Sequence, residues 1–349
     1  MFIDNTRQNF TELPKQSYAS GERLYFTLPK VGLLSKLRLN ITGVMTTAAG
    51  TGSVALSDRG AWNLIKRIKL IANSGAAIFD VSGYGTFLIN NLLKNGHAPD
   101  AYVGSVDRGS GAEVYAAPVA EGANNWKLSL EIPIAINDRD PIGLILLQNN
   151  ATQMVLEVEF NTASGANNTL APVVVTGNAT ASFVGTAGVM MEYFTTPRKE
   201  EDYPPLNIIH QWLENQDALT STGAFTKSLL RGDTYMKLIH SLTLANALNT
   251  TAVDKLRVLY NQSETPYTLD KISQLALQRS RYGHDLPKGC YVHDWYYSGG
   301  IVNLGTSRDF INSANVTEFQ TEVTINSGAT VTAGQSFLNT ISEKLIRIA

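Results

Sequence analysis

The sequence has one cysteine, Cys290, among its 349 residues. A single thiol cannot form an intrachain disulfide, so packing and hydrogen bonds must hold the fold together. No run of 18 apolar residues occurs, and a helix that spans a bilayer needs about that length or more. The first ten residues carry Asp4 and Arg7 and lack the continuous apolar core of a secretory signal peptide.

Charged residues are also scarce. They make up 17% of the chain, against about 25% in an average soluble protein. The 28 Lys and Arg nearly balance the 30 Asp and Glu, which gives a formal net charge of −2. This balance argues against a protein that coats nucleic acid or an acidic membrane through charge. A surface with few ions is suited to packing against neighbouring subunits, because fewer ions lose their water.

Apolar residues form 44% of the chain, as in ordinary globular proteins. They alternate with polar residues in several short segments, and this alternation with period 2 predicts half-buried β-strands. The clearest segments are residues 23–28, 36–41, 67–70, 126–136 and 152–160. Gly-, Asn-, Ser- and Thr-rich stretches between them predict loops. Many strands with few helices indicate an all-β protein with antiparallel sandwiches or barrels.

Two segments have helical spacing of their apolar residues, near 83–95 and 269–282. Gly96 and Gly283 follow them at the position where helices commonly end, and Thr268 is the expected N-cap of the second helix.

These helices belong to an internal repeat. Each follows the same order of features: a basic strand, an asparagine, a short turn and an aromatic residue. Asn73 corresponds to Asn261 and Phe79 to Tyr267, both at an offset of 188 residues. A repeat of about half the chain length predicts two copies of one sandwich. The proline- and charge-rich stretch 195–207 predicts the boundary. The expected division is an N-terminal arm (1–20), a first domain (21–197), a linker (198–205) and a second domain (206–349).

Candidate chemical sites are weak. His284, Cys290 and His293 are residue types that bind zinc, but their spacing fits no common zinc site, and a strand would point Cys290 and His293 to opposite faces. Glu157 and Glu159 resemble a glycosidase carboxylate pair, which would have to face each other across a sugar. No phosphate-binding or nucleophile-elbow motif occurs. We therefore predict no catalytic residue, no cofactor-binding residue, no metal site and no enzymatic activity.

Two segments resemble tectivirus-type major capsid proteins. The first is VALSDRGAWNLIKRIKLIANSG (54–75) with SGYGTFLINNLLKNG after it, and the second is RSRYGHDLPKGCYVHDWYYSGG (279–300). The order of these motifs, the doubled sandwich and the overall length extend the resemblance over nearly the whole chain.

The resemblance implies a double jelly roll: two tandem eight-stranded antiparallel jelly rolls with one short helix in each. It also implies a structural major coat protein of a tailless icosahedral bacteriophage. Three chains would form a pseudo-hexagonal homotrimeric capsomer in a shell around an internal membrane. The implied partners are further copies of the chain, minor capsid and membrane proteins of the virion and the membrane surface, without sequence-specific nucleic-acid binding. The implied location is the virion, after synthesis in the host cytoplasm.

The N-terminal arm is the expected membrane-facing segment, through Phe2, Ile3, Arg7, Phe10 and Lys15. These residues are too few to bury a helix in lipid, but basic and apolar side chains in many copies can hold a shell to an acidic surface. A frayed terminus without a partner is the competing interpretation. Two other functions remain open for the chain as a whole: a tandem jelly-roll enzyme acting on glycans, such as an amidase, and a minor vertex or spike protein of the same virus.

Overall fold

A computed structural model of the chain describes residues 2–73, 75–93, 101–103, 106–107, 121–136, 142–165, 171–261, 264–296 and 310–347. Backbone contacts divide the chain into two compact units. Unit 1 comprises Met1–Asn90, His97–Leu213 and Leu345–Ala349, and unit 2 comprises Asn91–Gly96 and Glu214–Lys344. The domain limits expected from the sequence, at residue 20 and at 198–205, stay predictions about where the domains separate.

The elements that lie in unit 1 are mostly strands. They are α1 (Phe2–Asn5), β1 (Gln8–Glu12), β2 (Gln16–Ala19), β3 (Arg23–Thr27), β4 (Leu33–Ala48), β5 (Val54–Leu56), η1 (Gly60–Leu64), β6 (Ile65–Ala72), β7 (Ala76–Val81), α2 (Gly83–Leu93), whose residues from Asn91 on belong to unit 2, β8 (Ala101–Val103), β9 (Val106–Asp107), β10 (Gly122–Pro133), β11 (Ile145–Leu146), β12 (Met154–Phe160), β13 (Ser164–Gly165), β14 (Val173–Val175), β15 (Thr180–Phe194) and η2 (Glu200–Asp202).

The remaining elements are also mostly strands. They are β16 (Ile208–Ala218), whose residues up to Leu213 belong to unit 1, β17 (Gly223–Ser228), β18 (Thr234–Leu244), β19 (Ala247–Leu248), β20 (Val253–Tyr260), β21 (Glu264–Asp270), α3 (Lys271–Tyr282), β22 (Cys290–Asp294), β23 (Ile311–Asn312), η4 (Ser313–Asn315), β24 (Phe319–Ile325) and β25 (Phe337–Arg347), whose residues from Leu345 on belong to unit 1. No described helix is long and apolar enough to cross a bilayer.

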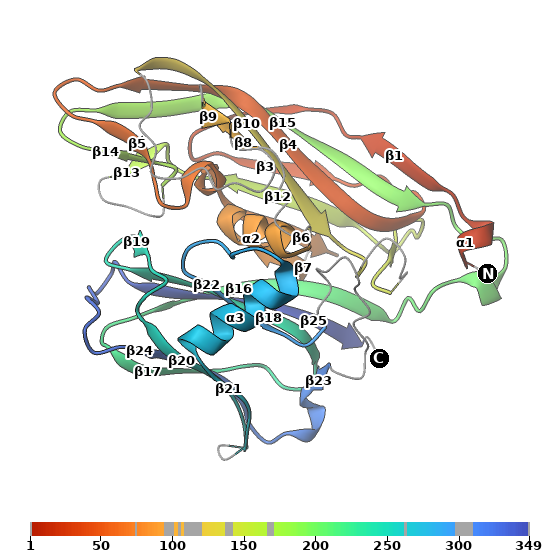
Figure 1. Cartoon of the computed structure of the whole chain (residues 1–349). Helices are drawn as coiled ribbons and strands as arrows, with labels where there is room; N and C mark the ends of the chain where they lie inside the picture. Colours follow the sequence, from red (N-terminus) through yellow and green to blue (C-terminus); the bar gives the residue numbers. More distant parts are fainter. Residues whose placement is uncertain are drawn as a thin grey trace. The chain divides into compact units, whose positions relative to one another are not determined.

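The chain contains two sets of eight strands, and each set is arranged in two runs of four strands with the same strand order (Figure 1). In unit 1, the run β1-β15-β4-β10 belongs to the first sheet and the run β3-β12-β6-β7 to the second sheet. The second set, most of which lies in unit 2, repeats this order in the runs β16-β25-β18-β22 and β17-β24-β20-β21. Taken in chain order, the strands of the two units occupy the same places, and each helix follows the fourth strand of the second sheet. The predicted doubled jelly roll with one helix in each copy is confirmed by this topology, with α1 as an additional single turn.

The alternation that predicts the strands also explains their burial. In β4, Leu37, Leu39 and Ile41 are at most 1% exposed and face the core of unit 1, whereas Lys36 and Arg38 point outward between them. β4 pairs along nearly its whole length with β10 on one side and β15 on the other. Two apolar faces therefore enclose a core, because a strand buries every second side chain.

The chain before residue 23 contains two strands that no apolar alternation in the sequence predicts. β1 pairs antiparallel with β15 from Gln8 to Glu12, and β2 pairs with the same strand from Gln16 to Ala19. These strands supply the first position of the first sheet in unit 1. The sequence signal is weak because β1 alternates between exposed and half-buried positions only, so it has no apolar period to detect.

The cap of the second helix is also corrected. α3 begins at Lys271, and the side chain of Asp270, not Thr268, accepts a hydrogen bond from the N–H of Ser273 at 2.8 Å. The expected end of the helix is confirmed, since Gly283 has a left-handed backbone with φ of 73°. Gly96, the expected end of the first helix, lies outside the described residues.

Candidate assembly surface

The outward side of the first sheet of unit 1 is an exposed surface with little charge. We call it the β4 face and define it by the outward residues of β4, β10 and β15 toward one end of these strands: Asn40, Thr42, Val44, Lys127, Val184 and Thr186. Val184 is 58% exposed and Val44 36%, although they are direct cross-strand partners. Lys127 is the ionisable residue among these six positions.

Hydrogen bonds between short side chains order this face. The hydroxyls of Thr42 and Thr186, which are cross-strand partners, lie 3.2 Å apart. The hydroxyl of Ser129 donates to Oδ1 of Asn40 at 2.8 Å. Short side chains held in this way lose little conformational entropy when a second surface covers them. The β4 face therefore has ordered side chains and few charges, so covering it costs little solvation energy.

A pair of glycines below this face explains how the sheet stays regular. Gly43 and Gly185 are opposite each other on β4 and β15, on the side that faces the core. A Cβ on either residue would come within 2.9 Å of the Tyr18 hydroxyl oxygen. The ring of Tyr18 stacks on Phe160 of the opposing sheet with a 4.0 Å centroid distance. The glycines thus make room for an aromatic contact between the two sheets.

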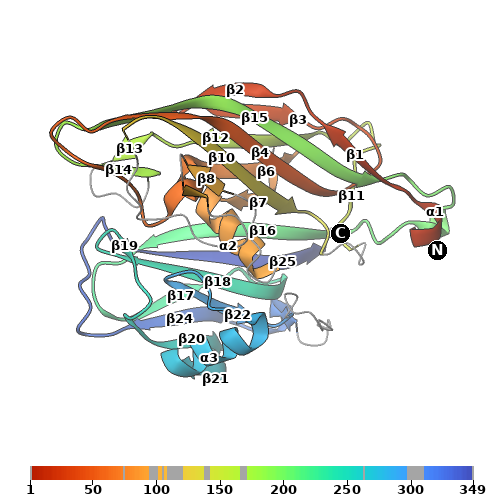
Figure 2. The same cartoon turned by 45° about the horizontal axis from the view of Figure 1, so that its top comes forward.

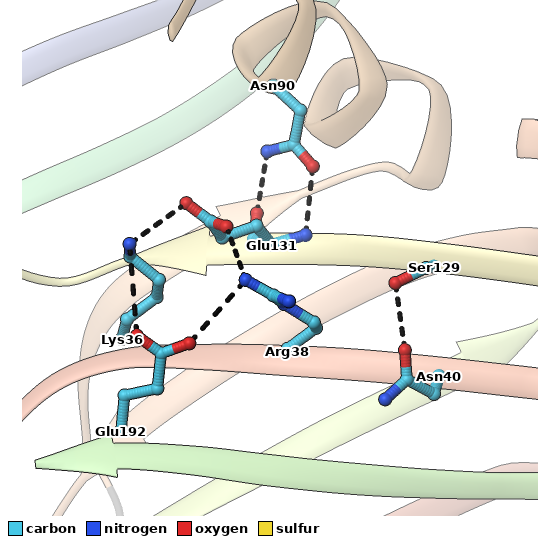
Figure 3. A network of polar contacts seen from close by, with 7 residues as sticks. All are labelled: Lys36, Arg38, Asn40, Asn90, Ser129, Glu131 and Glu192. Atoms are coloured by element: carbon cyan, nitrogen blue, oxygen red, sulfur yellow. Dashed lines mark hydrogen bonds and ion pairs between the residues drawn. The ribbon is translucent and has the colours of Figure 1, made fainter. Parts of the chain in front are cut away.

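Four charged side chains cluster at the other end of β4, on the same outward side of the sheet (Figure 3). Lys36 and Arg38 project from β4 and meet Glu131 of β10 and Glu192 of β15. Nζ of Lys36 lies 3.3 Å from Oε1 of Glu131, and Arg38 lies 3.2 Å from Glu131 and 3.5 Å from Glu192. Both carboxylates are 5% exposed. Two positive and two negative groups cancel, so this end of the sheet adds little net charge to the face.

α2 covers the free edge of β10 beside this cluster. The side chain of Asn90 accepts from the N–H of Glu131 at 2.8 Å and donates to its carbonyl at 2.7 Å, in the manner of an added strand (Figure 3). In unit 2, α3 contacts the edge of β22 through a donor only, since the side-chain amide of Gln274 donates to the carbonyl of Val292 at 2.6 Å. Figure 2 shows α3 beside β22 and β21. Both helices therefore block strand edges that could otherwise pair with another chain.

The five residues predicted to face a membrane do not share one environment. Phe2 packs edge-on against Phe194, with ring centroids 5.4 Å apart, in a cluster with Leu33 and Leu144. Ile3 belongs to α1, but its side chain lies outside the described set.

Arg7, Phe10 and Lys15, in contrast, are exposed. The backbone of Arg7 exchanges hydrogen bonds of 2.9 Å with Thr195. Phe10 is 59% exposed on β1, and the stem of Lys15 lies over Gly188. The segment is therefore attached to unit 1 and presents three of its five predicted side chains to solvent.

The residues considered for metal binding and catalysis also have clear positions. β22 places Cys290 and His293 on opposite faces of a strand, because successive side chains alternate, and His284 lies in the preceding loop. No group of three metal-ligating side chains occurs among the described residues. Arg23 is 3.2 Å from both Glu157 and Glu159, and Lys66 is 2.7 Å from Glu159. Burial alone would raise the pKa of Glu159, but Lys66 and Arg23 outweigh it and lower the pKa, whereas a general acid needs a raised one.

Sequence reasoning missed the four-charge cluster and the helix amides that cover the strand edges. Lys36 and Arg38 were recognisable as outward residues of a strand, because they alternate with leucines. Their partners come from strands about 90 and 150 residues further along the chain, and only strand order brings those strands beside β4.

Comparison with known proteins agrees with this topology. No family model matches the sequence, and no curated protein does. Solved structures match over nearly the whole chain at low identity. The crystal structure of the STIV MCP is 12% identical with a TM-score of 0.70, covering 98% of this chain and 97% of that one. An atomic structure of Sulfolobus Turreted Icosahedral Virus is 14% identical with a TM-score of 0.69, covering 97% and 91%.

A third structure is the major capsid protein P2 from Bacteriophage PM2. It is 9% identical with a TM-score of 0.55, and the match covers 98% of both chains. At such identities the likeness concerns the fold. The chain has the double jelly-roll fold found in these viral capsid structures, as the sequence resemblance predicts.

Proposed function

We propose that the chain is the major coat protein of an icosahedral virus and acts by assembling with further copies of itself in the virion shell. The observation that carries this proposal is the β4 face: an exposed, ordered sheet surface with one ionisable residue, on a fold shared with viral capsid structures. A face of this kind loses little solvation energy when a second copy covers it.

The assembly unit that we propose is a homotrimer. Each chain contains two jelly rolls with one strand order, so three chains present six similar units and approximate a hexagon. In such a ring the β4 face of one copy packs against a neighbouring copy. The internal membrane and the minor virion proteins belong to the same proposal, with the exposed residues of the N-terminal segment as the membrane contact.

A non-enzymatic role agrees with the carboxylates of the second sheet of unit 1. Glu157 and Glu159 are both paired with Arg23 and lie two residues apart on one strand, so they do not face each other across a space for a sugar, as glycan hydrolysis needs.

Native mass spectrometry followed by negative-stain imaging tests the coat-protein proposal. We expect a trimer with a hexagonal outline. A protein that stays monomeric at all concentrations, with no particles of higher order, would contradict it.

Charge substitution tests the β4 face itself. Val184→Asp places a carboxylate in the proposed contact, where its desolvation costs several kcal/mol, and we expect folded monomers in place of trimers. Ile272→Asp is the matched control, because Ile272 is 77% exposed on α3 and lies outside the face. Normal trimers from Val184→Asp would show that this face is not part of the contact. The coat-protein proposal would then still depend on the native mass and the negative-stain images.

A further inference from the structure

Three ionisable side chains are enclosed together inside unit 2. Lys237 is 0% exposed, Glu343 1% and Asp294 3%. They come from neighbouring strands, because β18 lies between β22 and β25, and Lys237 is the direct antiparallel partner of Asp294. Nζ of Lys237 lies 3.7 Å from Oδ2 of Asp294 and 3.5 Å from Oε2 of Glu343.

The carboxyl group of Asp294 is fixed by two donors. The backbone N–H of Tyr296 donates to Oδ1 at 3.0 Å, and the hydroxyl of Tyr282 donates to Oδ2. The guanidinium of Arg281 binds the backbone carbonyl of the same residue. Asp294 therefore has one oxygen against a backbone N–H, as an oxyanion site requires, and the other beside the lysine and a hydroxyl.

We propose that Lys237 and Asp294 join in an intramolecular isopeptide bond, with Glu343 as the group that relays the protons. The three side chains supply what amide formation needs: an amine, a carboxyl group held beside it, and a second carboxylate in a site without bulk water. The proposal concerns unit 2 alone and does not depend on the coat-protein function.

The step balances in atoms and charge. The ammonium of Lys237 passes one proton through Glu343 to Oδ2 of Asp294, which leaves a neutral amine and a neutral carboxyl group, and the amine then attacks Cγ of Asp294. The bond between Nζ and Cγ forms, the negative charge that develops on Oδ1 is held by the N–H of Tyr296, and the bond between Cγ and Oδ2 breaks. Of the three ammonium hydrogens, one stays on the amide nitrogen and two leave with Oδ2 as water. Glu343 ends in the state in which it began.

The proton transfer is a necessary first step. Burial lowers the pKa of Lys237, but the charges of Asp294 and Glu343 outweigh it, and the pKa is raised above its ordinary value. The amine therefore becomes a nucleophile only when a carboxylate of the cluster takes its proton. Glu343 is placed for this role on the strand opposite Asp294, across β18.

The bond would replace the buried ion pair of Lys237 and Asp294, which is costly to desolvate, with a neutral amide. It would also close a loop from residue 237 to residue 294 and so restrict the unfolded chain, as other cross-links do.

Mass spectrometry of the denatured full-length wild-type protein tests the proposal. We expect a mass lower than that of the sequence by one water. Tryptic digestion should give a branched peptide, in which residues 232–255, uncleaved at Lys237, are joined to residues 289–308. A wild-type protein of full sequence mass without the branched peptide would overturn the proposal and leave a buried ion cluster.

Variants assign the roles. Lys237→Met should restore the full mass, and a water deficit that persists in it would overturn the bond, because the loss would then arise elsewhere. Glu343→Gln should lower the linked fraction at least tenfold in freshly purified protein, and an unchanged fraction would overturn the relay role. Lys344→Met is the matched control, since Lys344 is 3% exposed on the same strand and pairs with Asp233, and it should keep the deficit.

Discussion

The two asparagines of the repeat make the same turn in both units. Asn73 has φ of 49° and Asn261 of 51°. Oδ1 of Asn73 accepts from the N–H of Gln153 at 2.8 Å, and Oδ1 of Asn261 accepts from the N–H of Thr317 at 2.7 Å. Asparagine tolerates this backbone region better than other residues with a Cβ. At the scale of a residue, the repeat with an offset of 188 residues thus places the same asparagine turn in both units.

We predict that Asn261→Ala lowers the free energy of unfolding by about 2–3 kcal/mol, through strain at positive φ and loss of the side-chain acceptor. Asn261→Gly removes only the acceptor and should cost about 1 kcal/mol less, because glycine is free of that strain. Denaturant unfolding of both variants gives the comparison. Equal losses would show that the backbone conformation at this turn carries no strain.

Two histidines are buried together in unit 2, and from them we predict that its stability depends on pH. His240 and His293 are 0% exposed, with ring centroids 5.4 Å apart. His240 lies between the hydroxyls of Thr340 and Thr321, each 3.3 Å away. Burial, with the positive charge of Lys227, lowers the pKa of His240 to about 3. Burial, with His240, lowers the pKa of His293 well below its usual range.

The sign follows from linkage. Below the ordinary histidine pKa of about 6.5 the unfolded chain binds protons that the folded chain does not, so stability falls as the pH is lowered toward 3. We expect the free energy of unfolding to be about 2 kcal/mol lower per histidine at pH 5 than at pH 8. His240→Gln should make the free energies of unfolding at the two pH values differ by about 2 kcal/mol less than in the wild type, as measured by denaturant unfolding at both. A variant with the wild-type difference would contradict the assignment.

At the scale of an element, the start of α3 has an expected N-cap, Thr268, and a different observed N-cap, Asp270. Asp270→Ala removes the observed cap and should cost about 1 kcal/mol, whereas Thr268→Ala should change stability by less than about 0.5 kcal/mol. Both positions are exposed, so packing contributes little to either result. Thermal or denaturant unfolding measures both losses. A larger loss of stability from Thr268→Ala than from Asp270→Ala would show that Thr268 is the cap.

The side-chain amide of Asn90, which binds the edge of β10, should contribute more to stability than the cap of α3. Asn90 is 0% exposed, and Asn90→Ala leaves the N–H and carbonyl of Glu131 without the partner shown in Figure 3. We expect a loss of about 2–4 kcal/mol in unfolding free energy, because buried backbone groups are costly to leave unpaired. Asn125→Ala, at an exposed position of the same strand, is the control and should be nearly neutral. A small effect at Asn90 would mean that water replaces the amide at this edge.

At the scale of the whole molecule, the N-terminal segment carries the prediction of membrane contact. β1 and β2 are part of the first sheet, so deleting residues 2–12 would damage the fold as well as any membrane contact. A variant with Arg7→Gln, Phe10→Ser and Lys15→Gln changes only exposed side chains. We expect it to fold and form trimers but to bind acidic lipid vesicles at least tenfold more weakly than the wild type when many copies are displayed together. Equal vesicle binding would remove the membrane role from these side chains.

The sequence by itself determined the strands with an apolar period, both helices and the repeat, and its resemblance to tectivirus-type capsid proteins implied the double jelly roll. The strands, helices and repeat depend on local alternation, on turn residues such as Asn73 and Asn261, and on an order of elements that can be compared along the chain. Only the tertiary structure decided that residues 8–12 and 16–19 are strands, that Asp270 caps α3, and which partners meet Lys36, Asn90 and Lys237. β1 has no buried face to reveal it, and the partners lie on strands far along the chain, so strand order alone sets their contact.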